Sequence, residues 1–420
     1  MHTELEMKIP MLEGLTPTSI LLDEHEVATA NHTLATTELP TTRTEAWKYT
    51  RVAKLGKTNY SSEPAQVDSI DPFLIAKKAT TVVFINGHFS EEFSSDEMPE
   101  GISISPLSAC LEGEIPESTI LLEGEIFSAL NTAFLTDGIL IDIDAKVNLE
   151  TPIQIIHILK GEASLSNFKT IINAGDFSKA TIIQGFFASE ADKAFANVTS
   201  EISVGKNAHL TIDKIQYEAE NTSHISTEQV AQEKDSTFTI NTITLNGGLV
   251  RNNLNIDVNG ENCTTNLNGT YLLKGKQHVD NHTVVDHKVP NCNSNELYKG
   301  VIDDQSTAVF NGKVFVRPDA QKINAFQSNG NVLMSNDASV NSKPELEIYA
   351  DDVKCSHGST TGQLDEEAVF YLRARGLSEK SARKLMISAF IGDVLDQVEN
   401  EEVLDYAHGL LTERFGWNFN

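Results

Sequence analysis

A weak internal repeat runs through the β-rich middle of this chain. Each copy has a polar turn, then a small residue, then a strand of alternating apolar and polar residues. The small residues, spaced 28, 28 and 27 apart, are Ala180, Ala208, Ser236 and Cys263. Related segments follow at Ser306 and Ala338 with wider spacing. A β-rich unit this short cannot bury its apolar face alone and must stack on its neighbours. The repeat therefore predicts a parallel β-helix, since a β-sandwich would explain the alternation but not the sustained period.

The texture of the sequence divides the chain into three parts. Residues 1–138 read as a mixed region of helices and irregular segments, with a hairpin turn at Asn86-Gly87 and a short helix at 126–135. Trp47 is expected to anchor this region on the rest of the protein. Residues 139–360 form the predicted β-helix core, and residues 361–420 a C-terminal helical domain. The predicted class is mainly β, with helical regions on both sides of the core.

The C-terminal domain has clear helix signals. Gly376 is placed to end a first helix, and Ser378 to cap a second. A third helix is expected at 401–414. The second helix has apolar residues at helical spacing: Ala382, Leu385, Met386, Ala389, Phe390, Val394, Leu395 and Val398. Such a module would either cap the open end of a solenoid or dock a partner, and periodicity does not decide between these roles.

Charge and cysteine content limit the partners and the compartment. The net charge is -28, from 60 acidic and 32 basic residues, which disfavours nucleic acid and anionic membranes as partners. Residues 1–6 are acidic without an apolar core, and no apolar run approaches the roughly 20 residues that span a bilayer. The four cysteines lack any CxxC spacing and predict a reducing compartment. These features together predict a cytoplasmic protein.

One short polar segment carries two soft donor groups. Cys355 and His357 stand two residues apart, and in an extended strand residues i and i+2 point to the same side. A thiol and an imidazole that converge on one point suit iron, copper or zinc. Two donors do not complete a metal site, so further ligands would have to come from elsewhere. The competing interpretation is a buried thiol beside a surface histidine.

A second group of donors lies upstream, but its spacing matches no compact zinc motif. Its members are His278, Asp280, His282, Asp286, His287 and Cys292. Polar ladders and solvated histidines explain it equally well. The chain has no GxxxxGK[ST] loop and no GxSxG elbow, so it predicts no self-contained enzyme. A carbohydrate-active β-helix enzyme is the rival, although the sequence shows no row of acids for it.

Several motifs resemble the SufB/SufD family of iron–sulfur cluster assembly proteins. They occupy 312–316, 320–325, 346–358 with its CSHG sequence, 364–367 and 370–376. Segments 43–50 and 83–90 resemble SufD-type rather than SufB-type members. The resemblance implies a right-handed parallel β-helix in a non-catalytic scaffold subunit. It also implies a complex with a SufB-type subunit and two copies of the SufC-type ATPase.

The resemblance assigns roles to particular residues. Cys355 and His357 would contribute half of an assembly site at the SufB interface. A transient iron–sulfur cluster would form there, with no permanently bound cofactor. The C-terminal helices would dock the SufC ATPase, with these contact residues: Leu385, Met386, Ala389 and Phe390. No glutamate at 387–393 matches the acidic ligand of SufB-type members. A homodimeric scaffold that holds a cluster without SufB is the alternative.

Overall fold

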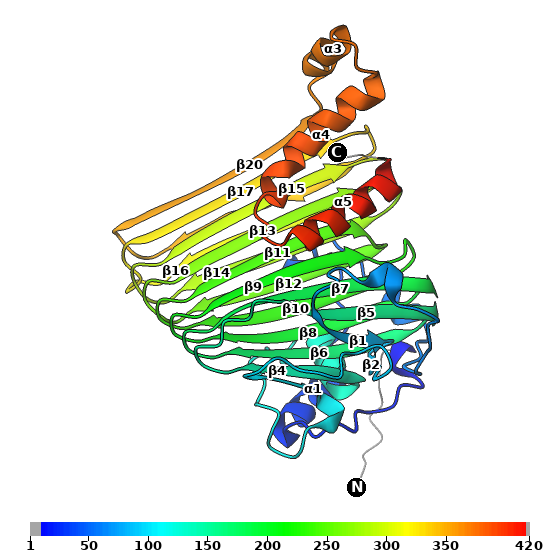
Figure 1. Ribbon diagram of the computed structural model, residues 1–420, viewed down its shortest axis with the longest axis vertical. Helices are drawn as coiled ribbons and strands as arrows, with labels where there is room; N and C mark the ends of the chain where they lie inside the picture. Colours follow the sequence, from blue (N-terminus) through cyan, green and yellow to red (C-terminus); the bar gives the residue numbers. More distant parts are fainter. Residues whose placement is uncertain (1–9, 417–420) are drawn as a thin grey trace.

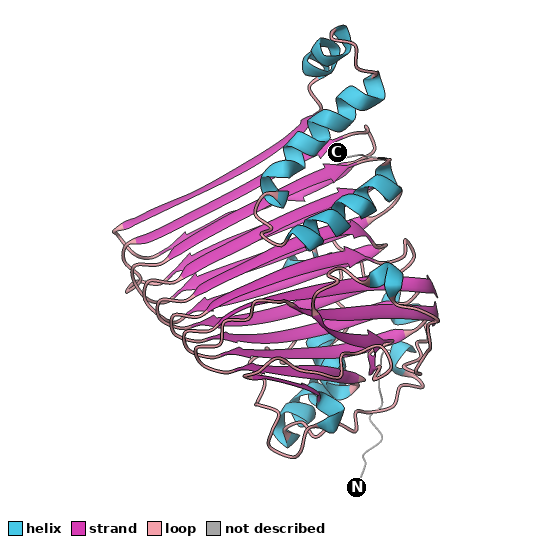
Figure 2. Cartoon of the chain, viewed as in Figure 1, coloured by secondary structure: helices cyan, strands magenta, loops and turns pink. Residues whose placement is uncertain are grey.

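The alternating segments of the chain form a parallel β-helix, as the repeat predicts. The computed structural model describes residues 10–416, so the acidic segment 1–6 lies outside the described residues. Each coil adds one strand to each of two ten-stranded sheets, and neighbouring core strands pair in parallel. Figure 1 shows the coils stacked in sequence order, and Figure 2 shows helices at both ends of the stack. Alternate side chains point into the space between the sheets, where the main hydrophobic core lies.

The first sheet ends at the strand that carries the two predicted donors. In spatial order it comprises β2 (His88–Phe89), β1 (Thr80–Ile85), β5 (Ile153–Glu162), β7 (Lys179–Asp192), β9 (His209–Tyr217), β11 (Thr237–Asn246), β13 (Thr264–Leu273), β15 (Asn293–Ile302), β17 (Ile323–Leu333) and β20 (Val353–Gln363). The second sheet comprises β18 (Ser339–Ser342), β16 (Thr307–Val316), β14 (His278–His287), β12 (Leu249–Val258), β10 (Ser223–Gln232), β8 (Phe195–Val204), β6 (Leu165–Ala174), β4 (Asp137–Ile143) and β3 (Ile102–Pro106), while β19 (Glu345–Ile348) also pairs with β16.

Some helices of the described residues pack directly on the sheets, and others pack on a neighbouring helix. They are α1 (Glu24–Thr36), α2 (Ile126–Ala133), α3 (Glu366–Ala374), α4 (Glu379–Leu395) and α5 (Glu401–Phe415). Short 3-10 turns occur at Pro10–Leu12, Glu45–Trp47, Leu55–Lys57, Asp71–Phe73 and Leu107–Ala109. Helix α2 packs on β6 and β8, whereas α4 contacts β13 and β15, and α5 contacts β11. Helices α4 and α5 therefore run along the side of the solenoid, whereas α3 packs on α4 and projects past the end of the stack (Figure 1), and β20 remains largely exposed.

The strand registers correct the alignment of the repeat. Ala180 pairs with Leu210, two residues beyond the predicted partner Ala208. Residues in contact between adjacent coils are 27 to 31 positions apart in the chain. Ser306 and Ala338 precede strands of the second sheet, not the first. Each coil has two corners with small residues and polar turns, and the sequence pattern does not distinguish them.

Local signals in the sequence are confirmed at three places. Asn86 and Gly87 both have positive φ, 49° and 82°, in the turn between the antiparallel strands β1 and β2. Gly376, with φ of 98°, follows the end of α3. The Ser378 side chain accepts a hydrogen bond from the Ser381 backbone N–H and so caps α4. In each case short-range backbone geometry fixes the structure.

The buried face of α4 differs from the predicted one. Ile387 and Ile391 are buried against the first sheet, together with Val394 and Leu395, whereas Leu385 is exposed. The apolar residues of this helix surround more than one face. The apolar stripe predicted for α4 from residue spacing is therefore only partly in contact with the first sheet.

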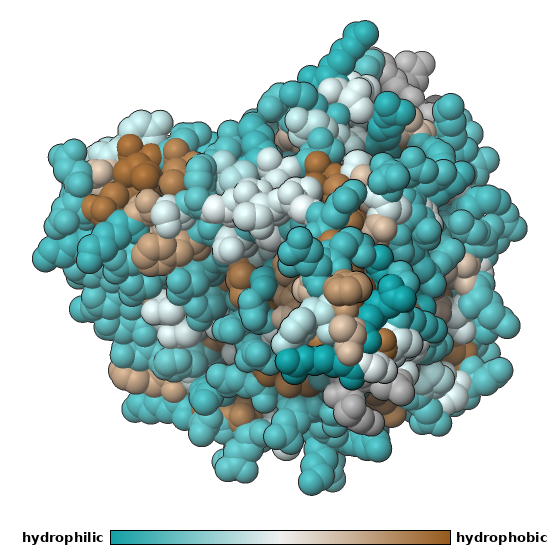
Figure 3. All heavy atoms as spheres, turned by 90° about the horizontal axis from the view of Figure 1, so that it is seen from above, coloured by the Kyte–Doolittle hydropathy of each residue, from teal (hydrophilic) through white to brown (hydrophobic). Residues whose placement is uncertain are grey.

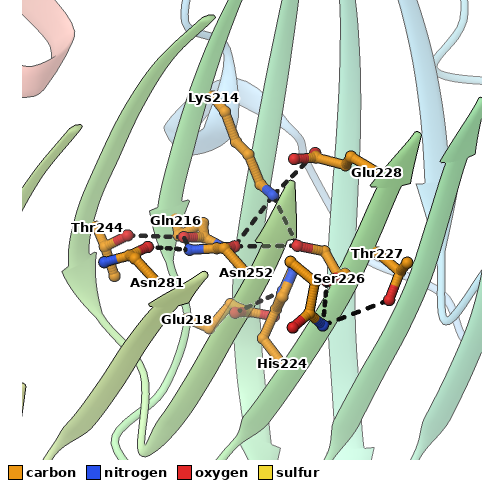
Figure 4. Close-up of polar contacts among 11 residues, drawn as sticks. Lys214, Gln216, Glu218, His224, Ser226, Thr227, Glu228, Thr244, Asn252 and Asn281 are labelled. Atoms are coloured by element: carbon orange, nitrogen blue, oxygen red, sulfur yellow. Dashed lines mark hydrogen bonds and ion pairs between the residues drawn. The ribbon is translucent and has the colours of Figure 1, made fainter. Parts of the chain in front are cut away.

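Polar side chains fill part of the space between the sheets. The Lys214 ammonium is buried, and its Nζ donates to Glu228 Oε1 at 3.1 Å, Ser226 Oγ at 2.9 Å and Asn252 Oδ1 at 3.1 Å. Asn252 Nδ2 also donates to Asn281 on the next coil (Figure 4). The network links residues of both sheets, so each member has partners that a purely apolar core would not supply.

Replacing Lys214 with methionine is expected to lower the free energy of unfolding by about 3–5 kcal/mol, because Glu228 would remain buried without a counter-charge. The double variant Lys214→Met/Glu228→Leu should recover most of this loss. Urea unfolding measures both. The exposed pair Lys193–Glu162 provides the control, and Lys193→Met should change stability little. An effect of K214M no larger than that of the control would contradict this interpretation.

Candidate functional site

The solenoid ends in an open edge. Within residues 10–416, β20 pairs with β17 alone, while the second sheet ends in the short strands β18 and β19. Most of β20 is exposed along its eleven residues. Figure 3, which looks onto this end, shows apolar atoms gathered at one side of a mostly polar face. Exposed apolar residues near it include Phe326, Ile348 and Tyr349. A long edge strand with unpaired backbone groups is a ready surface for pairing with another chain.

Cys355 and His357 lie on this edge strand, which confirms the extended conformation predicted for the two residues. Cys355 is in register with Ala325 of β17, and His357 with Gln327. Cys355 is half-buried against the core between the sheets, whereas His357 is exposed. Both residues occupy the same side of β20 because they are two positions apart. The open end therefore leaves a thiol and an imidazole accessible from outside.

Burial raises the pKa of the Cys355 thiol, although a hydrogen bond with the backbone of Ala325 opposes this effect. The sulfur is therefore mainly a protonated thiol at neutral pH. Metal binding requires the thiolate, so a metal at this position would displace the proton. We therefore expect Cys355 to become a metal ligand only when a cation is present to displace the thiol proton.

A buried carboxylate lies beneath His357, and the sequence analysis did not identify it. In the first sheet Leu267, Glu296, Gln327 and His357 are paired in successive coils, and we call this set the interior column. Glu296 accepts hydrogen bonds from Thr283 Oγ1 and from Gln327 Nε2, the latter at 2.8 Å. Burial raises the pKa of Glu296 to about 7, against these two hydrogen bonds. The sequence signal for Glu296 is a glutamate at a position that is apolar in the preceding coil. This signal can be recognised only when the register between the coils is known.

The segment from His278 to Cys292 does not converge on one point. Asp280 accepts from Arg251 Nη1 at 2.6 Å, and Arg251 stacks on Trp47 at 3.8 Å. Thr50 contacts both Asp280 and His278. These residues fix the N-terminal region on β12 and β14, which confirms the anchoring role predicted for Trp47.

His282 Nε2 lies 3.0 Å from Asp280 Oδ1, and the other members of that segment have separate partners. Asp286 pairs with Arg317, and the His287 ring is 2.9 Å from Ser294 Oγ. The Cys292 thiol packs beside that of Cys263 at a buried corner. Within the described part of the chain, no group of three or more His, Cys, Asp or Glu side chains is arranged to hold a metal ion. Polar ladders account for this segment.

The four residues predicted to dock an ATPase lie on two sides of α4. Leu385 and Ala389 are exposed, whereas Met386 and Phe390 are partly buried against the first sheet. On α3, Phe370 and Tyr371 are also exposed, with 72% and 56% of their surface accessible. The α3–α4 corner therefore presents aromatic and aliphatic side chains outward, as interaction surfaces do.

None of the helices in residues 10–416 is both long enough and apolar enough to cross a membrane. The fold and the open end together define a parallel β-helix protein with donor groups on a free edge strand. Residues 157–390 match the family model for the SUF system FeS cluster assembly, SufBD core domain, and residues 21–155 match the SufBD protein N-terminal region. The chain belongs to the SufBD family. The two family models meet near residue 156, within β5.

The chain is similar along most of its length to curated members of this family. An iron–sulfur cluster assembly SufBD family protein of Synechocystis is 32% identical, over 92% of this chain and 89% of the relative. The iron–sulfur cluster assembly protein SufD of Escherichia coli is 29% identical, over 88% of this chain and 87% of that protein. SufD of Bacillus subtilis is 27% identical over 66% and 64%. The comparisons favour the assembly family over a carbohydrate-active enzyme.

The Glu296→Gln variant tests the buried carboxylate. The folded state holds the Glu296 proton up to about pH 7, whereas the unfolded chain releases it near its ordinary pKa of about 4.3. Glu296 therefore favours folding most at low pH, and this contribution is lost as pH rises toward 7. The stability of E296Q relative to the unsubstituted protein should increase from about pH 5 to about pH 8.

Urea unfolding at each pH measures this difference. The control is Glu190→Gln, which changes an exposed carboxylate of β7 and should leave the pH profile unchanged. Parallel profiles for E296Q and the unsubstituted protein would show that Glu296 titrates normally.

Proposed function

We propose that this chain is a non-catalytic scaffold subunit of the SUF system and contributes half of a site for iron–sulfur cluster assembly. The observation that carries this proposal is the position of Cys355 and His357 on the same side of an edge strand that, within the described residues, pairs on one side only. Membership of the SufBD family and the two SufD relatives support the same role.

Two donors are too few for a stable cluster, which accounts for transient binding. A thiolate and a neutral imidazole both suit iron, but a cluster requires additional ligands. A SufB-type subunit paired with β20 would bring its own donors to the opposite side. The edge strand supplies backbone hydrogen-bonding groups for such pairing, and the exposed Phe326, Ile348 and Tyr349 supply apolar contact area. The cluster is cargo in this proposal and not a resident cofactor.

The exposed corner of α3 and α4 is the proposed docking surface for a SufC-type ATPase. Phe370, Tyr371 and Leu385 are large apolar residues with little contact to the remainder of the chain. Aromatic and aliphatic anchors of this kind supply most of the energy of protein interfaces. ATP-driven movement of the bound ATPase would then act on α4, which packs against the same sheet that ends in β20.

Substitution of His357 with alanine tests the assembly site. His357 is exposed, so the variant should fold with nearly unchanged stability. Iron and sulfide per complex, after co-expression with SufB-type and SufC-type subunits, should fall by about tenfold or more. Lys354→Ala is the matched control, because Lys354 is exposed on the other side of the same strand. If the H357A complex contained as much iron and sulfide as the unsubstituted complex, His357 would not be part of the assembly site.

The same measurement distinguishes the homodimeric alternative. If the isolated chain held as much iron and sulfide as the co-expressed complex, a second copy rather than a SufB-type subunit would complete the site. The proposal predicts substantially more of both in the complex.

Replacing Leu385 with aspartate tests the docking surface. A charge at the centre of an apolar contact should weaken binding of the SufC-type subunit by about tenfold or more, measured by calorimetry. Leu111→Asp is the matched control, since Leu111 is also exposed, at 69% against 49% for Leu385, but belongs to the N-terminal region. Equal affinities for L385D and L111D would move the docking surface elsewhere.

A further inference from the structure

The interior column contains, just before its last residue, a buried amide oxygen that has no hydrogen-bond partner among the described residues. Gln327 is 4% exposed, and its Oε1 makes no hydrogen bond within the described residues. It lies in register directly beneath His357, one strand further into the solenoid. A buried acceptor without a donor is destabilising, and native proteins retain few of them. Such an atom directly beneath the His357 ring is placed to accept a hydrogen bond from that ring.

The orientation of the Gln327 amide is fixed from below. Its Nε2 donates to Glu296 Oε2 at 2.8 Å, and Thr283 Oγ1 donates to Glu296 Oε1. Ionised Glu296 only accepts hydrogen bonds, and protonated Glu296 still accepts at Oε2 when its proton lies on Oε1 toward Thr283. The nitrogen end of the amide therefore faces Oε2, and the oxygen end faces away. Glu296 thereby determines which end of Gln327 is available to the coil above.

The pair lies close to the backbone of the opposite sheet at Gly312. A Cβ atom added to Gly312 of β16 would stand 2.9 Å from Gln327 Nε2 and 3.0 Å from Glu296 Oε2. Both polar groups are thus packed against bare backbone. Even a methyl group at position 312 would displace them.

We propose that Glu296 and Gln327 are positioning residues for His357, with Gln327 Oε1 accepting a hydrogen bond from one ring nitrogen of that histidine. This inference rests on the proposed function and adds a support for its imidazole. A neutral imidazole carries its proton on one nitrogen and a lone pair on the other. An acceptor beneath the ring selects the tautomer with the proton facing inward, which leaves the outer nitrogen free to bind iron. Metal-binding histidines commonly have their second nitrogen fixed in this way.

The position of the polar residues along the interior column supports this role. The column is apolar at Leu267 and becomes polar only at Glu296, two coils before His357. Glu296 and Gln327 are buried and do not reach the surface themselves. Their polarity therefore serves the coil above them, where the column reaches the open end.

The test uses protein with ¹⁵N-labelled histidine, and the His357 signals are assigned by their absence in H357A. In the unsubstituted protein the two ring nitrogens should resonate far apart, as one protonated and one bare nitrogen. Glu296→Gln allows the amide to reverse, and Gln327→Met removes the acceptor. Both variants should move the two signals toward the averaged positions of a solvated histidine. Iron and sulfide in the co-expressed complex should fall by about 10- to 100-fold.

Asp213→Asn is the matched control, because it also removes a buried carboxylate of the first sheet, hydrogen-bonded by Asn241 at 2.7 Å, but lies distant from the open end. It should leave the His357 signals unchanged. Thermal unfolding identifies any variant that fails to fold, and either E296Q or Q327M is sufficient for the test.

The outcomes separate this inference from the proposed function. Unchanged His357 signals and cluster content in folded E296Q and Q327M, with H357A inactive, would overturn the positioning role alone. Averaged signals in the unsubstituted protein would also overturn it. Full cluster content in H357A would instead refute the proposed function.

Discussion

The backbone hydrogen bonds between successive coils are the constraint on which this structure depends. Each core strand pairs with the strand one coil before it and one coil after it, so a β-helix always leaves two edges without partners. At the N-terminal end the edge strands are short and antiparallel, two residues in β2 and five in β3. At the other end β20 leaves eleven residues in parallel register. The chain thus protects one edge and leaves the other available for association.

The interior of the solenoid reflects the same asymmetry. Coils near the N-terminal end stack isoleucines, such as Ile153 on Ile182, in a tightly buried apolar ladder. Further along, the corresponding positions hold groups that need hydrogen bonds, and each is stabilised only because its partners sit on adjacent coils. Polar interiors are less forgiving than apolar ones, since the loss of one partner leaves another buried group unsatisfied. Buried polar groups are retained despite this loss of stability where they orient a side chain at the open end.

The sequence predicted much of the fold because the determining interactions are local. Alternation defines the strands, and the turn at Asn86-Gly87 and the cap at Ser378 depend on a few neighbouring residues. The same-side placement of Cys355 and His357 follows from strand geometry alone. The register between neighbouring coils could not be predicted from the sequence, because a small residue marks a corner equally well at Ser178 and at Ala180. The roles of Glu296 and Gln327 were hidden for the same reason: they lie 61 and 30 positions from His357 and meet it only through the correct register.

Helix α4 and the edge strand β20 both lie against the same strand, β17. Gly330 of β17 is in register with Thr360 of β20, and a Cβ at Gly330 would stand 3.3 Å from the Phe390 ring of α4. Lys299 of β15 adds an ion pair with Asp393 and lies 4.7 Å over the Phe390 ring, so α4 is fastened to the sheet next to β17. Strand β17 also carries Gln327 on its inner side. Gln327 and Gly330 are three positions apart on β17, so the residue beneath His357 and the residue that faces Phe390 of α4 belong to the same strand. The C-terminal helices are thus fastened to the strand that lies directly beneath the open edge of the sheet.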